Sequence, residues 1–199
     1  EEYIRRAAMA GLDAIAIADV NSVAGIVRSH TEAREIARKV RERRNADAAT
    51  GLIGPPRPDH VPPPASAPIY ATPRLMPAAR LEFSDAPPIT ALPENRQGWG
   101  NLCRLLSKGR LRAEKGSCIM HLGDLLEFGT GLQLILHPHP HRHRSPRGAC
   151  DWAKHLPQLS RRFAGRLQLA LAPGYDGEDA TRFATRAQQA AQLGVPLVA

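Results

Sequence analysis

The stretch GLDAIAIADVNSVAGIVRSH, residues 11–30, decides the fold class of this chain. Residues 14–18 are an unbroken apolar run that is too short for a helix and is typical of a strand covered on both faces in a parallel sheet. After a polar loop, apolar side chains recur at the three-and-four spacing of a helix with one buried face, which we expect to continue to about Arg44. The stretch therefore predicts a strand, a loop and a helix of an α/β fold.

Asp19 stands at the carboxyl end of this predicted strand. In α/β folds the carboxyl ends of parallel strands are where catalytic and ligand-binding side chains gather. An aspartate in this position can equally cap the following helix or turn the loop. The residues alone leave both interpretations open.

The rest of the chain repeats the alternation of helical and strand-like patterns. Further helices are predicted at residues 2–10, 99–109, 122–128, 152–163 and 180–191. Further strands are predicted at residues 79–83, 89–92, 132–136 and 167–172, with one more beginning at Val195. We expect a hairpin through residues 84–88, and parallel strands with helices outside where strands and helices alternate. The pattern predicts a β/α barrel or its open relative.

Composition and charge narrow the class of protein. The 199 residues, 43% of them apolar, suffice for one domain with a real core. The net charge of +8 favours encounter with polyanions such as nucleic acid, although arginines on solvated faces explain it equally well. No run approaches the roughly 18 apolar residues of a membrane span, so we expect no membrane partner and a cytoplasmic location. Cys103, Cys118 and Cys150, without any CxxC, suit reduced thiols.

Two segments are compositionally irregular. Residues 54–77 are rich in proline and predict an extended excursion, which is a surface loop or, alternatively, a ligand for an SH3-like groove. The second segment is a loop at 137–148, rich in His, Pro and Arg. Alternate histidines in an extended segment can capture a metal, but the prolines and arginines disfavour it. The four histidines concerned are His137, His139, His141 and His143.

Residues 11–30 resemble the second strand-loop-helix unit of a PHP domain in bacterial error-prone DNA polymerases, which are C-family relatives of the DNA polymerase III alpha subunit. Residues 99–116 (WGNLCRLLSKGRLRAEKG), 131–137 (GLQLILH) and 194–199 (GVPLVA) resemble the same family in the same order. The resemblance implies that 1–199 is a partial PHP domain. Its fold would be a distorted β/α barrel, incomplete at both ends, with a proline-rich loop insertion. Because the chain begins with Glu1 and stops inside an apolar run, we expect a fragment.

The resemblance also implies where metal ligands would lie. Active PHP domains hold metal ions through histidines and carboxylates at the mouth of the barrel. Here Asp19 is retained, but Val20 stands where the family has a histidine, and Arg80 stands where it has a carboxylate, with Glu82 one alternation away. The remaining motifs would lie before Glu1 and after Ala199. We therefore predict at most a vestigial site of Asp19 and Glu82, or an Asp19–Arg80 ion pair, with Zn or Mn bound only if the site is intact.

Three functions follow as hypotheses. The favoured one is the N-terminal PHP scaffold of an error-prone DNA-directed DNA polymerase in DNA repair and translesion synthesis, not catalytic alone, with no cofactor of its own. Its partners would be the polymerase core of the same chain with its palm Mg, DNA through the parent protein, and other damage-tolerance proteins. The second is a free-standing metal-dependent PHP phosphoesterase. The third, weaker one is a basic nucleic-acid-binding module whose phosphate contacts would be Arg104, Lys108, Arg110, Arg112 and Lys115.

Overall fold

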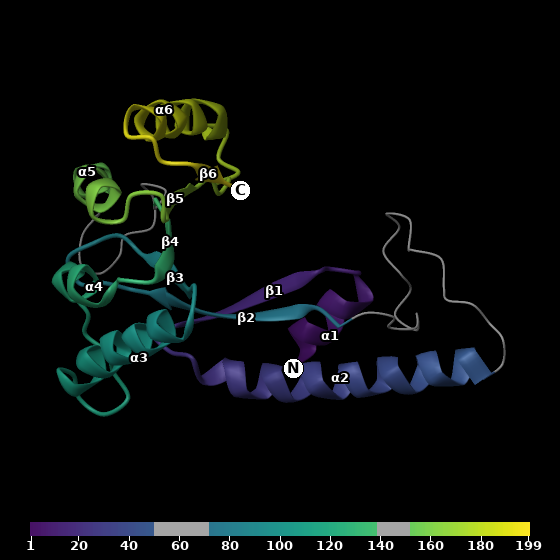
Figure 1. Cartoon of the computed structure of the whole chain (residues 1–199). Helices are drawn as coiled ribbons and strands as arrows, with labels where there is room; N and C mark the ends of the chain where they lie inside the picture. Colours follow the sequence, from purple (N-terminus) through teal and green to yellow (C-terminus); the bar gives the residue numbers. More distant parts are fainter. Residues whose placement is uncertain (50–71, 139–151) are drawn as a thin grey trace. The chain divides into compact units, whose positions relative to one another are not determined.

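The computed structural model describes residues 1–49, 72–138 and 152–199 of the chain (Figure 1). The helices in these ranges are α1 (Glu2–Met9), α2 (Ala24–Ala49), α3 (Arg96–Leu111), α4 (Leu122–Phe128), α5 (Trp152–Arg162) and α6 (Asp179–Gln192). The strands are β1 (Ala14–Val20), β2 (Arg74–Leu81), β3 (Ile89–Pro93), β4 (Leu132–Leu136), β5 (Leu167–Ala170) and β6 (Leu197–Val198). Most of the predicted proline-rich excursion and of the His-rich loop lies outside the described residues.

The strands are hydrogen-bonded in the order β1-β2-β3-β4-β5-β6. β2 and β3 form the predicted antiparallel hairpin, with Leu81 opposite Ile89, and β3 is also antiparallel to β4. From β4 onward, β5 and β6 each run parallel to the strand before them. The predicted α/β class, the hairpin and the parallel arrangement of the last third are thus confirmed.

By its internal contacts the chain divides into two compact units. The first comprises Glu1–Asp19 and Val23–Pro77. In it the apolar faces of α1 and α2 meet over a small core of Ile4, Ala8, Ile36 and Val40. Burial of Ile4, Ala8 and Val40 agrees with the helical spacing in the sequence, whereas Val27, which the same spacing places on the buried face of α2, is 72% exposed.

The second unit comprises Val20–Ser22 and Ala78–Ala199. Its core is rich in leucine, because alternate residues of β4 turn to the same face and are fully buried at Leu132, Leu134 and Leu136. α3 contacts α4, β3 and β4, and it covers the apolar side chains with its own buried leucines. The regular strand-and-helix alternation here provides the rigid frame on which the loops are placed.

Three boundaries differ from the sequence-based prediction by three residues or more. α2 continues to Ala49, past the expected end at about Arg44. β2 begins at Arg74, five residues before the predicted start, although Pro77 lies inside it. A proline is tolerated there because the ladder with β3 begins only at Ala79. α3 begins at Arg96, three residues early, because the side chain of Asn95 accepts a hydrogen bond from the backbone nitrogen of Gly98 at 2.9 Å.

Among the residues that the structure describes, no helix combines the length and apolar character needed to cross a membrane.

Candidate functional site

Asp19, the first predicted ligand, lies near the end of β1 and is bound to the start of α2. Its Oδ2 atom accepts a hydrogen bond from the backbone nitrogen of Gly25 at 2.6 Å. A negative charge here satisfies a backbone donor that has no partner within the helix and complements the helix dipole. A Cβ atom added at Gly25 would lie 2.7 Å from the same oxygen, so the carboxylate could keep this position only with glycine at residue 25. Within the first unit, Asp19 therefore caps the following helix, which is one of the two roles that the sequence left open for it.

Asn21 and Glu82 are hydrogen-bonded to each other at the strand ends of the second unit. Asn21 adopts the left-handed conformation, with φ of 48°, and its Oδ1 accepts a hydrogen bond from the backbone nitrogen of Glu82 at 2.8 Å. The backbone nitrogen of Asn21 also donates to the carbonyl of Arg80 at 2.9 Å. The Asn21 side chain thus continues the strand pairing beyond the end of β1. Sequence reasoning missed this role; the signal was an asparagine after a strand, since asparagine tolerates the left-handed region.

Arg80 and Glu82, the other two predicted site residues, are paired with each other. The Arg80 Nε atom lies 2.8 Å from Glu82 Oε1, and both side chains are partly exposed. Asp19 belongs to the first unit and Arg80 to the second, so the Asp19–Arg80 ion pair stays a prediction. Arg80 nevertheless has a carboxylate partner within its own unit.

Taken within the described part of its own unit, neither Asp19 nor Glu82 is accompanied by the ligands that a divalent metal needs. Val20, where the family has a histidine, is 59% exposed and offers no ligand atom. The carboxylates of Asp19 and Glu82 already accept protein hydrogen bonds, and two carboxylates without imidazole make a poor transition-metal site. Within residues 1–49, 72–138 and 152–199, no group of three or more His, Cys, Asp or Glu is arranged to hold a metal ion.

The predicted phosphate contacts of α3 are partly occupied by an acidic partner. Arg112 donates to both oxygens of Asp124, at 2.7 and 2.9 Å, and Asp124 is buried. Lys108 lies 2.7 Å from Glu127 and 3.2 Å from Asp124. The Arg112 guanidinium, with help from the His121 backbone nitrogen and Lys108, holds the pKa of Asp124 well below its usual range despite burial. These bonds fasten α3 to α4, so Lys108 and Arg112 have structural roles.

The other predicted phosphate contacts make fewer or longer bonds to the protein. Arg110 donates to the carbonyl of Asn21 at 3.1 Å, and Arg104 donates to Asn101 at 3.3 Å. Phosphate binding by the five residues stays a prediction, and Arg104 and Lys115 remain the least committed to the fold.

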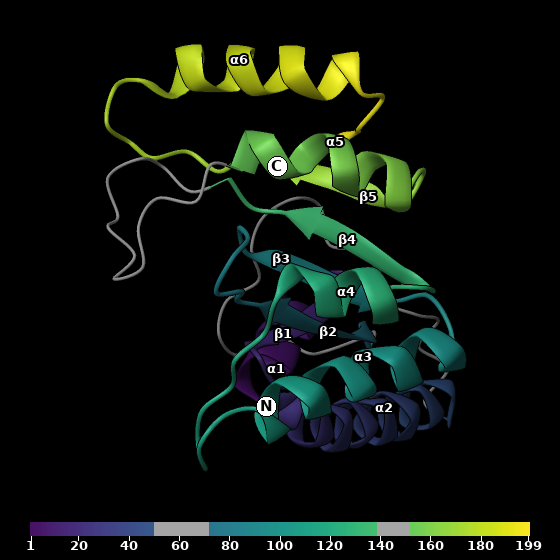
Figure 2. The same cartoon turned by 90° about the vertical axis from the view of Figure 1, so that its left-hand side faces the viewer.

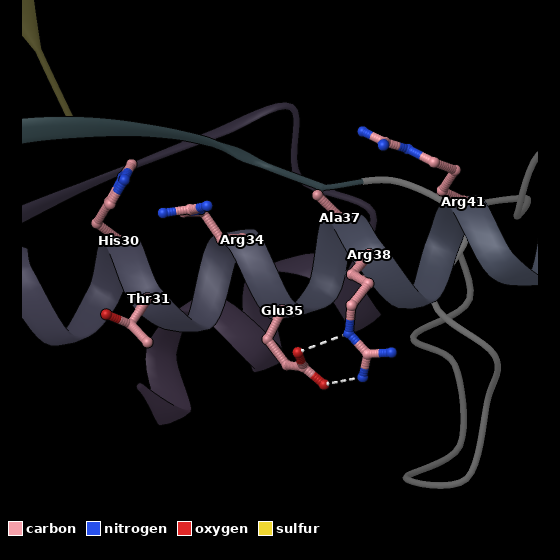
Figure 3. A pocket seen from close by; sticks show the side chains of 7 residues that line it. All are labelled: His30, Thr31, Arg34, Glu35, Ala37, Arg38 and Arg41. Carbon is pink, nitrogen blue, oxygen red and sulfur yellow. Dashed lines mark hydrogen bonds and ion pairs between the residues drawn. The ribbon is translucent and has the colours of Figure 1, made fainter.

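A second basic surface follows one face of α2, along an open cavity of about 560 Å³ (Figure 3). His30, Arg34 and Arg41 project from the same side of the helix, and none of them forms an ion pair within the described ranges. Arg38, in contrast, is held by Glu35 at 2.6 Å and by Glu42. The guanidinium of Arg38 lowers the pKa of Glu35 to about 2. This exposed face of α2 carries positive charge. The sequence analysis did not single it out as a basic surface.

Two histidines, His137 and His121, contact hydroxyl groups. His137 Nε2 lies 2.8 Å from the Thr90 hydroxyl, and the other three histidines of the predicted cluster lie outside the described residues. His121 Nδ1 lies 2.7 Å from the Ser84 hydroxyl and 3.7 Å from Asp85. Because serine and aspartate approach the same ring nitrogen, this trio lacks the relay geometry of a nucleophilic triad.

The chain was compared with protein families, curated proteins and solved structures. No family model matches the chain. The error-prone DNA polymerase of Ruegeria pomeroyi is 40% identical over 208 residues, which cover all of this chain and 18% of the relative. Error-prone DNA polymerase 1 of Rhizobium meliloti is 38% identical over 200 residues, again covering all of this chain and 14% of the relative. The chain thus spans less than a fifth of the length of these curated relatives.

A solved structure has a similar backbone. It comes from Bifidobacterium adolescentis and is assigned as a metal-dependent phosphoesterase. The match has a TM-score of 0.52, covers 98% of this chain and 79% of that one, and has 13% sequence identity. At this identity the likeness shows the fold alone. Along its whole length the chain is therefore homologous to a segment of bacterial error-prone DNA polymerases, and its fold is the PHP-type α/β fold that the sequence predicts.

Proposed function

We propose that this chain is the PHP scaffold segment of an error-prone DNA-directed DNA polymerase that acts in DNA repair and translesion synthesis. The observation that carries the proposal is the match of the entire chain to polymerases of that name, at 40% and 38% identity. Nucleotidyl transfer would belong to a palm domain elsewhere in the parent protein, with its own Mg. The segment itself would pack against the polymerase core and reach DNA only through the parent, in the cytoplasm.

A scaffold role is supported by what the strand-end residues do. Asp19 holds the start of α2, and Asn21 and Arg80 hold the region of Glu82. These side chains are engaged in keeping the fold rather than held ready for a substrate. Without a complete set of metal ligands, a segment cannot hold the metal ions that would activate water and bind a phosphate ester.

A phosphoesterase is the second candidate, because the solved structure with a similar fold is assigned as metal-dependent and hydrolytic. The two candidates differ in what the strand-end carboxylates contribute. In the scaffold they keep the structure, whereas in a phosphoesterase they would bind the catalytic metal.

The test uses the full-length protein and a double variant, Asp19→Asn with Glu82→Gln, which keeps the shape of both side chains and removes their charge. We expect primer extension at the wild-type rate, and no hydrolysis of p-nitrophenyl phosphate with Mn by either protein. Arg161→Gln, an exposed change on α5, is the control. Manganese-dependent hydrolysis that is lost in the double variant would replace the scaffold by the phosphoesterase.

A further inference from the structure

Arg186 on α6 is a buried cation with an unused donor. Its side chain is 3% exposed, and its Nη2 atom donates to the carbonyl of Pro138, just after β4, at 3.3 Å. Its Nη1 atom is buried and has no hydrogen-bond partner among the residues that the structure describes. Burial, with a smaller contribution from Arg182, lowers the pKa of Arg186 below its ordinary value. A buried guanidinium N–H without an acceptor is costly, so an acceptor is expected at this point.

The unused donor belongs to a residue that lines a cavity of about 390 Å³ between α5 and α6. Its described lining consists of Trp152, Glu178, Thr181, Arg182, Thr185 and Arg186. Trp152 is the first residue of α5, and the others lie at the cap and in the first turns of α6. Figure 2 shows α5 and α6 running in the same direction, with these ends at the side toward which β4 and β5 point. Ligand sites of α/β folds lie at this side of the sheet.

The other arginine of the cavity is already neutralised. Arg182 forms ion pairs with Asp176, at 2.7 Å, and with Asp179, and Glu178 lies 3.8 Å away. Asp179 also accepts hydrogen bonds from the backbone nitrogens of Gly174 and Tyr175. These two bonds hold the loop before α6. Arg186 is therefore the guanidinium with capacity left for a ligand.

The charge balance limits what that ligand can be. Three carboxylates face two guanidinium groups around the cavity, so an anion with several charges would be repelled. A group with one negative charge and an oxygen acceptor can satisfy Arg186 with less repulsion than a multiply charged anion would meet. The exposed hydroxyl of Thr181 at the rim offers a second donor.

We propose that the cavity between α5 and α6 binds a carboxylate group, which accepts a hydrogen bond from Arg186. The carboxylate has two possible sources, a free small molecule or an acidic side chain elsewhere in the full-length protein. The inference holds whether or not the protein is a polymerase, because it rests on Arg186 and its surroundings.

The experiment measures hydrogen–deuterium exchange of residues 174–190 in the full-length protein, with sodium acetate added at constant ionic strength. Wild type is compared with Arg186→Met, which keeps the length of the side chain without its donors, and with Arg161→Met on α5 as the control. We expect saturable protection in wild type and in the control, about tenfold when acetate is at about ten times its dissociation constant. Arg186→Met should show none.

Carboxyl footprinting of the same three proteins with a carbodiimide and glycine ethyl ester distinguishes the sources. If an internal acidic side chain fills the cavity, acetate has no effect, and one Asp or Glu of the full-length protein becomes labelled only in Arg186→Met. Neither acetate protection nor a newly labelled carboxyl group would mean that Arg186 meets only water, and the proposal would be overturned. A protection by acetate that persists in Arg186→Met would overturn it as well.

Discussion

The carboxylate of Asp19 approaches the backbone nitrogen of Gly25 to 2.6 Å, and the absence of a side chain at Gly25 is what permits this approach. The aspartate that first suggests a metal ligand is thereby tied to the start of the longest helix. Within the first unit, this contact joins the end of a strand to the start of a helix.

Gly25→Ala should destabilise the protein. The new Cβ would lie 2.7 Å from Asp19 Oδ2, so the carboxylate must move and its hydrogen bond is lost. We expect a loss of about 1–3 kcal/mol in the free energy of unfolding, measured by urea denaturation. In an Asp19→Ala background the same substitution should cost little, because the clash is gone. An equal cost in both backgrounds would contradict the role given to Asp19.

Gly98→Ala should be more damaging than Gly100→Ala in the same helix. A Cβ at residue 98 would lie 2.0 Å from the carbonyl oxygen of Gly131, whereas a Cβ at residue 100 meets nothing within 4 Å. Because the obstacle at residue 98 is backbone, we expect a cost above about 3 kcal/mol or failure to fold. Gly100→Ala should stabilise α3 by up to about 1 kcal/mol. Thermal unfolding of the two variants checks the contrast, and similar melting temperatures would refute it.

Asp124→Asn should weaken the junction of α3 and α4 in a pH-dependent way. The variant keeps the shape of the side chain but loses the charge that Arg112 and Lys108 contact, at a cost of about 1–3 kcal/mol near pH 7. Because the folded pKa of Asp124 lies below its ordinary value of 3.8, its contribution is complete well above that value. It is lost as pH falls through the folded pKa.

Urea denaturation of wild type and Asp124→Asn between pH 7 and pH 3 measures this difference. The difference between the two free energies of unfolding should begin to narrow below about pH 4 and be smaller at pH 3 than at pH 7. A gap that stays constant down to pH 3 would mean that the ionised carboxylate is not the source of the stability. Glu114→Gln, a carboxylate for which the structure shows no ion pair within the described ranges, serves as the control.

The full-length protein should carry no stoichiometric Zn or Mn in this segment. The reason is that Asp19 and Glu82 are bound to protein donors and that Val20 and Arg80 supply no ligand atom. Elemental analysis of the purified protein, before and after Asp19→Asn with Glu82→Gln, provides the measurement. One equivalent of metal that disappears in the double variant would show an active site where we predict a vestigial one.

Local patterns predicted the regular parts of the fold. The bounds of α4 and β4 agree with the prediction because short apolar runs there end at glycines and polar turns. The early start of β2 could not be predicted, since Pro73 and Pro77 indicate a loop unless the pairing partner is known. The start of α3 was missed because Asn95 was not considered as a cap, although its residue type permits that role.

The candidate site was harder to predict for a different reason. Asp19 was singled out by its place after a strand, and its capping role was one of two local possibilities. The role of Asn21 depends on Glu82, a residue 61 positions away, so no local pattern contains it. The buried state of Arg186 depends likewise on Pro138, 48 positions earlier in the chain.

The bond between Asn21 and Glu82 has a consequence for how the sequence can change over evolution. Asn21 fixes the alignment of the chain at the carboxyl end of β2, far from the segment that enters β2 from α2. Residues can therefore be inserted into or removed from the connection between α2 and β2 without shifting which side chains of β2 face the core. One asparagine thus makes the register of the sheet independent of the length of that connection.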